Sequence, residues 1–197
     1  KPGNFSSGKF YGPSPLRLGI ELSRNLMTVR LANQVGMAKI AETAERFKVA
    51  EEMPPVLAMA LGSGETTLLK LTTAYAMFVN GGKRIEPSFI DRIQDRTGAT
   101  QYRHDERACP GCTGADASME KVPLPAWEPE QVDDPVAVYQ IVTMLQGVID
   151  RGTATRAKIE GVPLAGKTGT SNDARDTWFI GFSSNLAVGI FVGFDQP

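Results

Sequence analysis

The sequence has 197 residues, of which 42% are apolar, 22% charged and 8% aromatic; this composition is that of a folded domain and argues against a disordered or fibrous chain. The 21 basic and 22 acidic residues give a formal net charge of −1 without any basic stripe, so we expect no nucleic-acid partner. No run of 18 apolar residues is present, which predicts that no segment of this sequence crosses a membrane.

The first half of the chain is predicted to be mainly helical. Residues 1–13 are rich in glycine, serine and aromatic residues and predict a loop. Ser14 and Pro15 then indicate a helix start, with serine as the N-cap and proline at the first helical position. The apolar pattern breaks at Ser23-Arg24-Asn25. Apolar periodicity predicts further helices over Leu26–Gly36, Met37–Phe47 and Thr66–Val79, the last ended by Asn80-Gly81-Gly82.

Strand patterns dominate the second half. Residues 88–94 and 99–103 flank Asp95-Arg96-Thr97-Gly98 and predict a hairpin. Residues 105–134 show no usable period and predict a long loop or insertion. A helix is then expected from Asp134-Pro135 to about Ile149. Three strands, at about 163–170, 176–183 and 186–194, close the chain. Helices followed by an antiparallel meander indicate an α+β fold, an antiparallel sheet flanked by helices.

The only histidine and the two cysteines restrict the chemistry. His104 lies in a polar stretch beside Asp105 and Glu106, which disfavours a Ser-His-Asp triad. Together with Cys109 and Cys112 it offers three zinc ligands, whereas a structural zinc site normally uses four. We therefore expect no metal and no other cofactor.

Lys167-Thr168-Gly169-Thr170 is the sharpest chemical signal. Lys167 provides a point charge suited to a carboxylate, and the two threonines add hydroxyl groups. Gly166 and Gly169 keep side chains off the strand, so a ligand backbone could pair with its edge. A glycine-bearing strand that leads into a turn, without any ligand, explains the same four residues equally well.

Ser23-Arg24-Asn25 is a weaker signal on its own, because such a triplet between two helices usually caps the second one. Combined with Lys167-Thr168-Gly169, which follows 144 residues later, it matches two of the three elements of the penicillin-recognising serine acyl transferases. The third element is Ser-x-x-Lys.

Longer strings make this likeness specific, and through them the chain resembles the transpeptidase domain of class A, bifunctional penicillin-binding proteins over nearly its whole length. One departure is Lys48, where the family often has glycine. The resemblance implies a penicillin-binding protein/β-lactamase-like fold, of which residues 1–197 are the C-terminal, incomplete part. The strings that carry the resemblance are Phe10-Tyr11-Gly12-Pro13-Ser14-Pro15-Leu16-Arg17, Ser23-Arg24-Asn25-Leu26, Leu61-Gly62-Ser63-Gly64-Glu65-Thr66-Thr67, Ala74-Tyr75-Ala76, Asn80-Gly81-Gly82, Gly166-Lys167-Thr168-Gly169-Thr170-Ser171 and Asp176-Thr177-Trp178-Phe179-Ile180-Gly181.

The resemblance implies acyl transfer. A serine attacks the D-Ala-D-Ala amide of a peptidoglycan stem peptide and forms an acyl-enzyme. The amine of a second stem peptide then attacks the acyl-enzyme, which creates a cross-link. β-Lactams mimic D-Ala-D-Ala and leave a stalled acyl-enzyme. Ser23 would relay a proton, and Asn25 would hold the substrate's peptide carbonyl. Lys167 would attract the terminal carboxylate, which the hydroxyls of Thr168 and Thr170 would bind. The backbone N–H of Thr170 would be one of two oxyanion donors.

The family's nucleophile is the serine of Ser-x-x-Lys on a buried helix upstream of the Ser23 triplet. Two formal matches exist here, Ser6-Ser7-Gly8-Lys9 and Ser118-Met119-Glu120-Lys121. Both lie in loop-like stretches without an apolar helix, and we reject both. We therefore predict that the nucleophile lies N-terminal to Lys1 and that the chain alone is inactive.

Cys109-Pro110-Gly111-Cys112 has proline and glycine at the centre of a four-residue turn, and such a turn brings its ends within disulfide reach. The resemblance implies an oxidising compartment, where a disulfide between Cys109 and Cys112 is expected. Two free thiols remain the alternative.

The resemblance also implies a location and partners. The full-length protein would be anchored at the periplasmic face of the bacterial inner membrane, carry a glycosyltransferase domain, bind stem peptides and β-lactams, and meet other cell-wall synthesis proteins.

Two rival interpretations are a loop-serine hydrolase that uses Ser6 and Lys9, and a non-catalytic cell-wall peptide-binding or scaffold module. Trp178 and Phe179 are expected to pack as strand residues beside the Lys167 strand.

Overall fold

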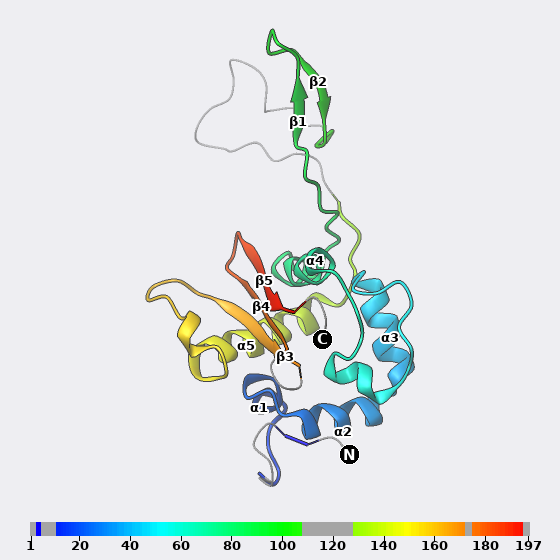
Figure 1. Cartoon of the computed structure of the whole chain (residues 1–197), viewed down its shortest axis with the longest axis vertical. Helices are drawn as coiled ribbons and strands as arrows, with labels where there is room; N and C mark the ends of the chain where they lie inside the picture. The colour runs from blue at the N-terminus through cyan, green and yellow to red at the C-terminus, as the bar shows by residue number, and fades with distance from the viewer. Residues whose placement is uncertain (1–2, 5–10, 108–127, 172–174, 195–197) are drawn as a thin grey trace. The chain divides into compact units, whose positions relative to one another are not determined.

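A computed structural model describes residues 3–4, 11–107, 128–171 and 175–194 (Figure 1). These residues fall into two compact units. The described residues of 1–84 and 131–197 form the first, and those of 85–130 form the second. All the predicted site residues that the structure describes belong to the first unit.

Four helices occupy the N-terminal part of the first unit, close to the ranges predicted from periodicity. They are α1 (Leu16–Glu21), α2 (Asn25–Val35), α3 (Met37–Arg46) and α4 (Leu68–Val79), and a short 3-10 helix, η1 (Leu57–Leu61), was not predicted. The predicted Ser14 cap is wrong. Pro15 takes the N-cap position with extended backbone, and no side chain caps the helix. The Ser14 hydroxyl donates to the Gly12 carbonyl at 3.3 Å and accepts from Arg24 Nη1 at 3.1 Å instead. Within the described residues, no helix has the length and apolar content needed to cross a bilayer.

The C-terminal part supplies a longer helix and the sheet. In α5 (Pro135–Arg151), Asp134 is the N-cap, as predicted, because its carboxylate accepts from the Val136 amide at 2.9 Å. A 3-10 turn, η2 (Thr155–Ala157), follows. The strands β3 (Ala165–Thr170), β4 (Asp176–Phe182) and β5 (Ala187–Gly193) pair antiparallel in the order β3-β4-β5. The predicted α+β fold with an antiparallel sheet is confirmed.

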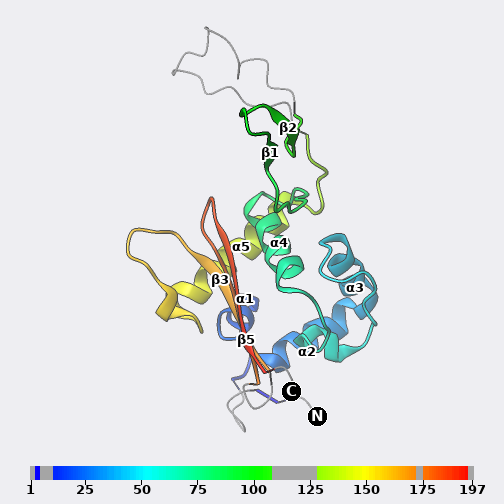
Figure 2. The ribbon, with the colours of Figure 1, turned by 45° about the horizontal axis from the view of Figure 1, so that its top comes forward.

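The core of the first unit lies between this sheet and two helices (Figures 1 and 2). Phe182 of β4 contacts the ring of Tyr75 from α4, with centroids 6.3 Å apart. It also belongs to the buried cluster that α5 forms with Ala165 of β3. Both helices therefore cover one face of the sheet. Burying each large apolar side chain of this kind stabilises the fold by roughly 1.5–3 kcal/mol. The cluster consists of Leu145, Val148, Ile149, Ala154, Ala165 and Phe182.

Trp178 and Phe179 lie in β4, directly beside β3, as expected from the sequence. Trp178 pairs with Gly169 and Phe179 with Thr168, and both side chains are half-buried. Trp178 packs on Phe191 of β5, with ring centroids 4.7 Å apart. The expectation that they are strand residues rather than an exposed platform is confirmed.

The second unit contains the predicted hairpin, formed by β1 (Arg92–Gln94) and β2 (Thr100–Arg103). Asp95 organises its turn. The Asp95 carboxylate accepts bonds from the Thr97 hydroxyl at 2.7 Å and from the amides of Thr97 and Ala99 at 2.8 and 3.0 Å. These hydrogen bonds, the Thr97 hydroxyl first, lower the pKa of Asp95. Gly98 has a φ of +87°, which glycine adopts readily.

Candidate active site

Ser23 lies in a tight turn between α1 and α2. The Arg24 amide donates to the Gly19 carbonyl at 2.8 Å and the Ser23 amide to that of Ile20 at 3.2 Å, the pattern of a Schellman helix end. Ser23 itself has a φ of +50°, in the left-handed region that usually belongs to glycine and costs another residue about 1 kcal/mol. The turn thus holds a hydroxyl-bearing residue where the backbone alone favours glycine.

Lys167 of β3 reaches this turn. Its ammonium Nζ lies 2.8 Å from Ser23 Oγ and 2.8 Å from the carbonyl oxygen of Thr168. Ser23 and Lys167 are 144 residues apart in the sequence, so the fold brings the two motifs into one site. Among the described residues, both partners of this ammonium are uncharged oxygens, and no carboxylate forms an ion pair with it. A half-buried cation without an acidic partner favours an anionic ligand.

Burial lowers the pKa of Lys167 to about 8, from an ordinary value of 10.5. The cause is desolvation, which disfavours the charged form of an amine. A lysine with a lowered pKa gives up its proton more readily near neutral pH, and its neutral amine can accept a proton from the Ser23 hydroxyl that it contacts.

The remaining motif residues lie along β3, an edge strand of the three-stranded sheet. Thr168 is half-buried and Thr170 is exposed, and alternate strand residues point to the same side. Side chains of β4 occupy the space beside Gly166 and Gly169. A Cβ at Gly166 would press on the Phe179 ring, and one at Gly169 would lie 3.3 Å from the Trp178 Cβ. The glycines therefore serve strand packing, and a ligand's access depends on the free edge.

Asn25 is not joined to Lys167. It begins α2, and its side-chain amide donates to the Gly3 carbonyl at 3.1 Å. Arg24 points elsewhere as well, with its guanidinium 3.9 Å from the centroid of the Tyr11 ring. Of the three predicted catalytic residues, the structure thus brings together Ser23 and Lys167.

The sequence did not reveal an ion pair next to this site, between the buried Glu21 and the half-exposed Arg151. Glu21, only 1% exposed, accepts two hydrogen bonds from Arg151 at the end of α5, one of them from Nε at 3.0 Å and the other from Nη2. A Cβ at Gly147 would overlap the Glu21 carboxylate, so this glycine makes room for it. The ion pair fixes α1, and with it the Ser23 turn, against α5.

Several sequence predictions lie outside the described residues. These are the cysteine pair Cys109 and Cys112 and both Ser-x-x-Lys matches, Ser6–Lys9 and Ser118–Lys121.

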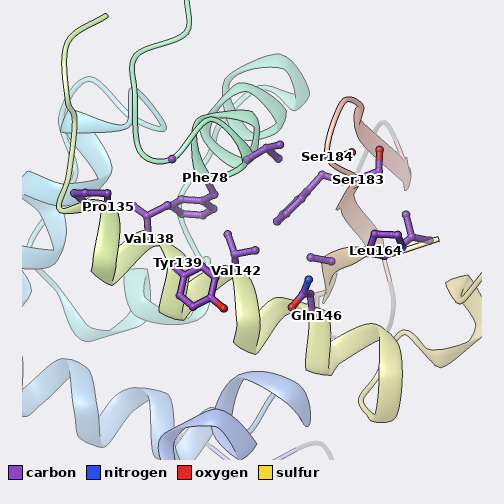
Figure 3. Close-up of a pocket in the computed structure, with 14 residues that line it drawn as sticks. Phe78, Pro135, Val138, Tyr139, Val142, Gln146, Leu164, Ser183 and Ser184 are labelled. Atoms are coloured by element: carbon purple, nitrogen blue, oxygen red, sulfur yellow. The ribbon is translucent and has the colours of Figure 1, made fainter. Parts of the chain in front are cut away.

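An apolar cavity of about 420 Å³ lies between α4, α5 and the sheet (Figure 3). No charged side chain occurs among its described lining residues, and none of the predicted site residues lines it. Its chemistry does not suit a carboxylate, so the candidate site is the one at Lys167. The cavity is lined by Phe78, Val79, Gly81, Pro135, Val138, Tyr139, Val142, Gln146, Pro163, Leu164, Ala165, Phe182, Ser183 and Ser184.

The chain as a whole has known counterparts. Residues 4–194 match the family described as "Penicillin binding protein transpeptidase domain". The chain therefore belongs to the family of penicillin-binding protein transpeptidase domains, which confirms the resemblance drawn from its motifs.

Individual relatives narrow the likeness to penicillin-binding proteins 1A. That of Rickettsia bellii is 47% identical over 199 residues, which cover 100% of this chain and 25% of the relative. That of Neisseria meningitidis is 34% identical over 194 residues, which cover 98% of this chain and 22% of the relative. The chain thus spans about a quarter of the length of these curated relatives.

Solved structures agree. The crystal structure of penicillin-binding protein 1A from Haemophilus influenzae superposes with a TM-score of 0.84 at 30% identity, over 99% of this chain and 32% of that one. Penicillin-binding protein A from M. tuberculosis, solved as its imipenem acyl-enzyme complex, gives a TM-score of 0.72 at 19% identity. The match covers 98% of this chain and 46% of that one. The second likeness shows the fold alone.

The lowered pKa of Lys167 gives a prediction for stability. The folded-state pKa, about 8, lies below the ordinary 10.5, so the unfolded chain binds more protons between these values and stability rises with pH across this window. The full shift corresponds to about 3 kcal/mol. We expect the free energy of unfolding of wild type, relative to Lys167→Met, to increase by roughly that amount between pH 7 and pH 10.5.

Urea unfolding of both proteins at the two pH values measures this difference. Lys39→Met, which removes an exposed lysine, is the matched control and should show no such change. If the free energies of unfolding of wild type and Lys167→Met differ by the same amount at both pH values, the lowered pKa is contradicted.

Proposed function

We propose that this chain forms the carboxylate-binding side of a peptidoglycan D,D-transpeptidase site. The nucleophile would lie in a Ser-x-x-Lys segment outside residues 1–197 of a longer protein, of which this chain is the C-terminal part of the transpeptidase domain, with an insertion at about 105–134. The observation that carries the proposal is the 2.8 Å contact between Lys167 Nζ and Ser23 Oγ, because it joins the two family motifs in one site.

In this proposal the terminal D-Ala carboxylate of a stem peptide lies against β3. The uncompensated charge of Lys167 attracts it, and the hydroxyls of Thr168 and Thr170 donate to it. The peptide lies along the free edge of β3, where backbone groups provide affinity. The Asn25 amide, released from the Gly3 carbonyl that it now contacts, holds the substrate's peptide carbonyl.

Proton transfer is the second part of the proposal. When the upstream serine attacks the D-Ala-D-Ala amide, the leaving amine needs a proton. In this proposal Ser23, whose Oγ lies 2.8 Å from Lys167 Nζ, relays the proton from the lysine to that amine. A lysine with a pKa of about 8 gives and takes protons near neutral pH, as a general acid–base group must.

The same site would accept β-lactams, which mimic D-Ala-D-Ala. The M. tuberculosis structure of the same fold was solved as an imipenem acyl-enzyme, and we propose the same reaction for the full-length protein here. We place that protein at the periplasmic face of the inner membrane, anchored, with a glycosyltransferase domain and with other cell-wall synthesis proteins as partners.

The test is binding of an N-acetylated D-Ala-D-Ala dipeptide to the 197-residue chain, followed by amide chemical shifts. We expect weak binding, with the largest shifts at Ser23, Thr168 and Thr170. The matched ligand is the same dipeptide with its C-terminal carboxylate converted to an amide, which should cause no such shifts. Equal binding of both ligands, or shifts confined to other regions, would refute the proposed carboxylate site.

A further inference from the structure

Thr153 touches the proposed carboxylate site although it belongs to none of the motifs found in the sequence. It follows the C-terminal end of α5, and its Oγ1 lies 2.8 Å from the Oγ1 of Thr168. Either hydroxyl could be the donor in this geometry. The pair is exposed to solvent, where water replaces a lost hydrogen bond at little cost to folding. The contact therefore has little value for stability, and its placement suggests a role in binding.

The position of Thr153 is set by the residue that also controls the Ser23 turn. The Thr153 amide donates to the Glu21 carbonyl at 3.1 Å, and the Glu21 carboxylate is held by Arg151. At Gly152 a Cβ would overlap the same carbonyl, so only glycine permits this approach. The backbone carbonyl of Glu21 thus fixes the position of Thr153. Glu21 also lies two residues before Ser23 in the sequence, so one residue positions both side chains.

The direction of the hydroxyl–hydroxyl bond follows from proton counting. A threonine hydroxyl carries one proton and can accept two further bonds. If Thr168 donates its proton to Thr153, it has none left for a ligand carboxylate, which only accepts. Thr168 can donate to the ligand only when Thr153 is the donor within the pair.

We propose that Thr153 is a positioning residue, whose hydroxyl donates to Thr168 Oγ1 and thereby leaves the Thr168 proton directed at the ligand's carboxylate. This inference rests on the proposed function, in which Thr168 binds that carboxylate. Thr153 acts through Thr168 and needs no contact with the reacting atoms.

The experiment uses the full-length protein and compares Thr153→Val, which keeps the shape and removes the hydroxyl, with Thr153→Ser, which restores it. The ligands are a fluorescent penicillin and its carboxylate methyl ester. We expect Thr153→Val to lower the second-order rate of acylation by the free acid about tenfold, the effect of one hydrogen bond. The rate with the ester, whose neutral carbonyl accepts a weaker hydrogen bond than a carboxylate does, should fall clearly less. Thr153→Ser should recover most of the wild-type rate.

Thr155→Val, two residues along the same segment, is the matched control and should react as wild type does. An unaltered rate for Thr153→Val with the free acid would overturn the inference. An equal loss with the acid and the ester would overturn it too, because a merely structural role affects both. A wild-type protein that no penicillin acylates would instead refute the proposed function itself.

Discussion

Replacing Lys167 with alanine in the full-length protein is expected to slow β-lactam acylation by roughly 10²–10³-fold, since in the proposed mechanism Lys167 carries a proton and attracts the ligand's carboxylate. Lys167 Nζ contacts Ser23 Oγ, and in the described structure it has no carboxylate partner of its own. The fold should survive, because desolvation of this cation already costs stability at neutral pH.

Stopped-flow or gel-based labelling with a fluorescent penicillin measures this rate, and circular dichroism checks the fold. Lys39→Ala, at an exposed lysine of α3, is the matched control. Lys167→Arg separates the two roles, since arginine keeps the charge but does not release a proton. A folded Lys167→Ala protein that is acylated at the wild-type rate would remove Lys167 from the mechanism.

The 197-residue chain alone is expected to form no stoichiometric adduct with penicillin. Acylation needs a nucleophile beside a base and two oxyanion donors. Ser23 with Lys167 satisfies the first condition in the structure, with 2.8 Å between Oγ and Nζ. In the proposed full-length protein we expect the second oxyanion donor, beside the Thr170 N–H, to be the backbone N–H of the nucleophilic serine outside residues 1–197. Its absence raises the barrier by roughly 3–4 kcal/mol. A trace reaction is the most that Ser23 should support.

Intact mass spectrometry after incubation with a fluorescent penicillin decides this point, with Ser23→Ala and urea-unfolded chain as controls. A stoichiometric adduct on any serine of residues 1–197 would show that the nucleophile has been misplaced, and peptide mapping would then test Ser6 and Ser23 first. If the full-length protein also fails to react while still binding the D-Ala-D-Ala dipeptide, the non-catalytic cell-wall peptide-binding alternative would replace the transpeptidase.

The elements that carry local signals were predictable from the sequence. The start of α5 depends on Asp134 and Pro135, which act within one turn, and the hairpin turn depends on Asp95 and Gly98. Where two local signals compete, the prediction shifted by a residue or two, as at Ser14 and Pro15. Local chemistry fixes these boundaries because its partners are close in the sequence.

Lys48 illustrates what a departure from the family pattern means in the fold. It has a φ of +55°, and the Lys48 and Val49 amides donate to the Glu45 and Ala44 carbonyls at 2.8 and 2.9 Å, again a Schellman ending. The position requires the left-handed backbone that glycine adopts freely. The chain thus retains the turn with a residue that fits it less well.

The candidate site was predictable only through the resemblance. Neither Ser23-Arg24-Asn25 nor Lys167-Thr168-Gly169 reveals that its side chains meet, because their contact depends on the packing of α1, α5 and β3. The Glu21–Arg151 pair and Thr153 were missed for the same reason. Two clues existed: Glu21 is the single acid of α1, and Gly147 is the single glycine inside α5.

The ion pair between Glu21 and Arg151 has a consequence for the order in which the protein is made. The two residues are 130 positions apart, and at roughly 5–20 residues per second a ribosome needs on the order of ten seconds to pass from one to the other. During that interval α1 exists without the partner of its carboxylate, and the Ser23 turn is held only by its own local hydrogen bonds to Gly19 and Ile20. The position of this turn against α5 is therefore fixed only after α5 has left the ribosome.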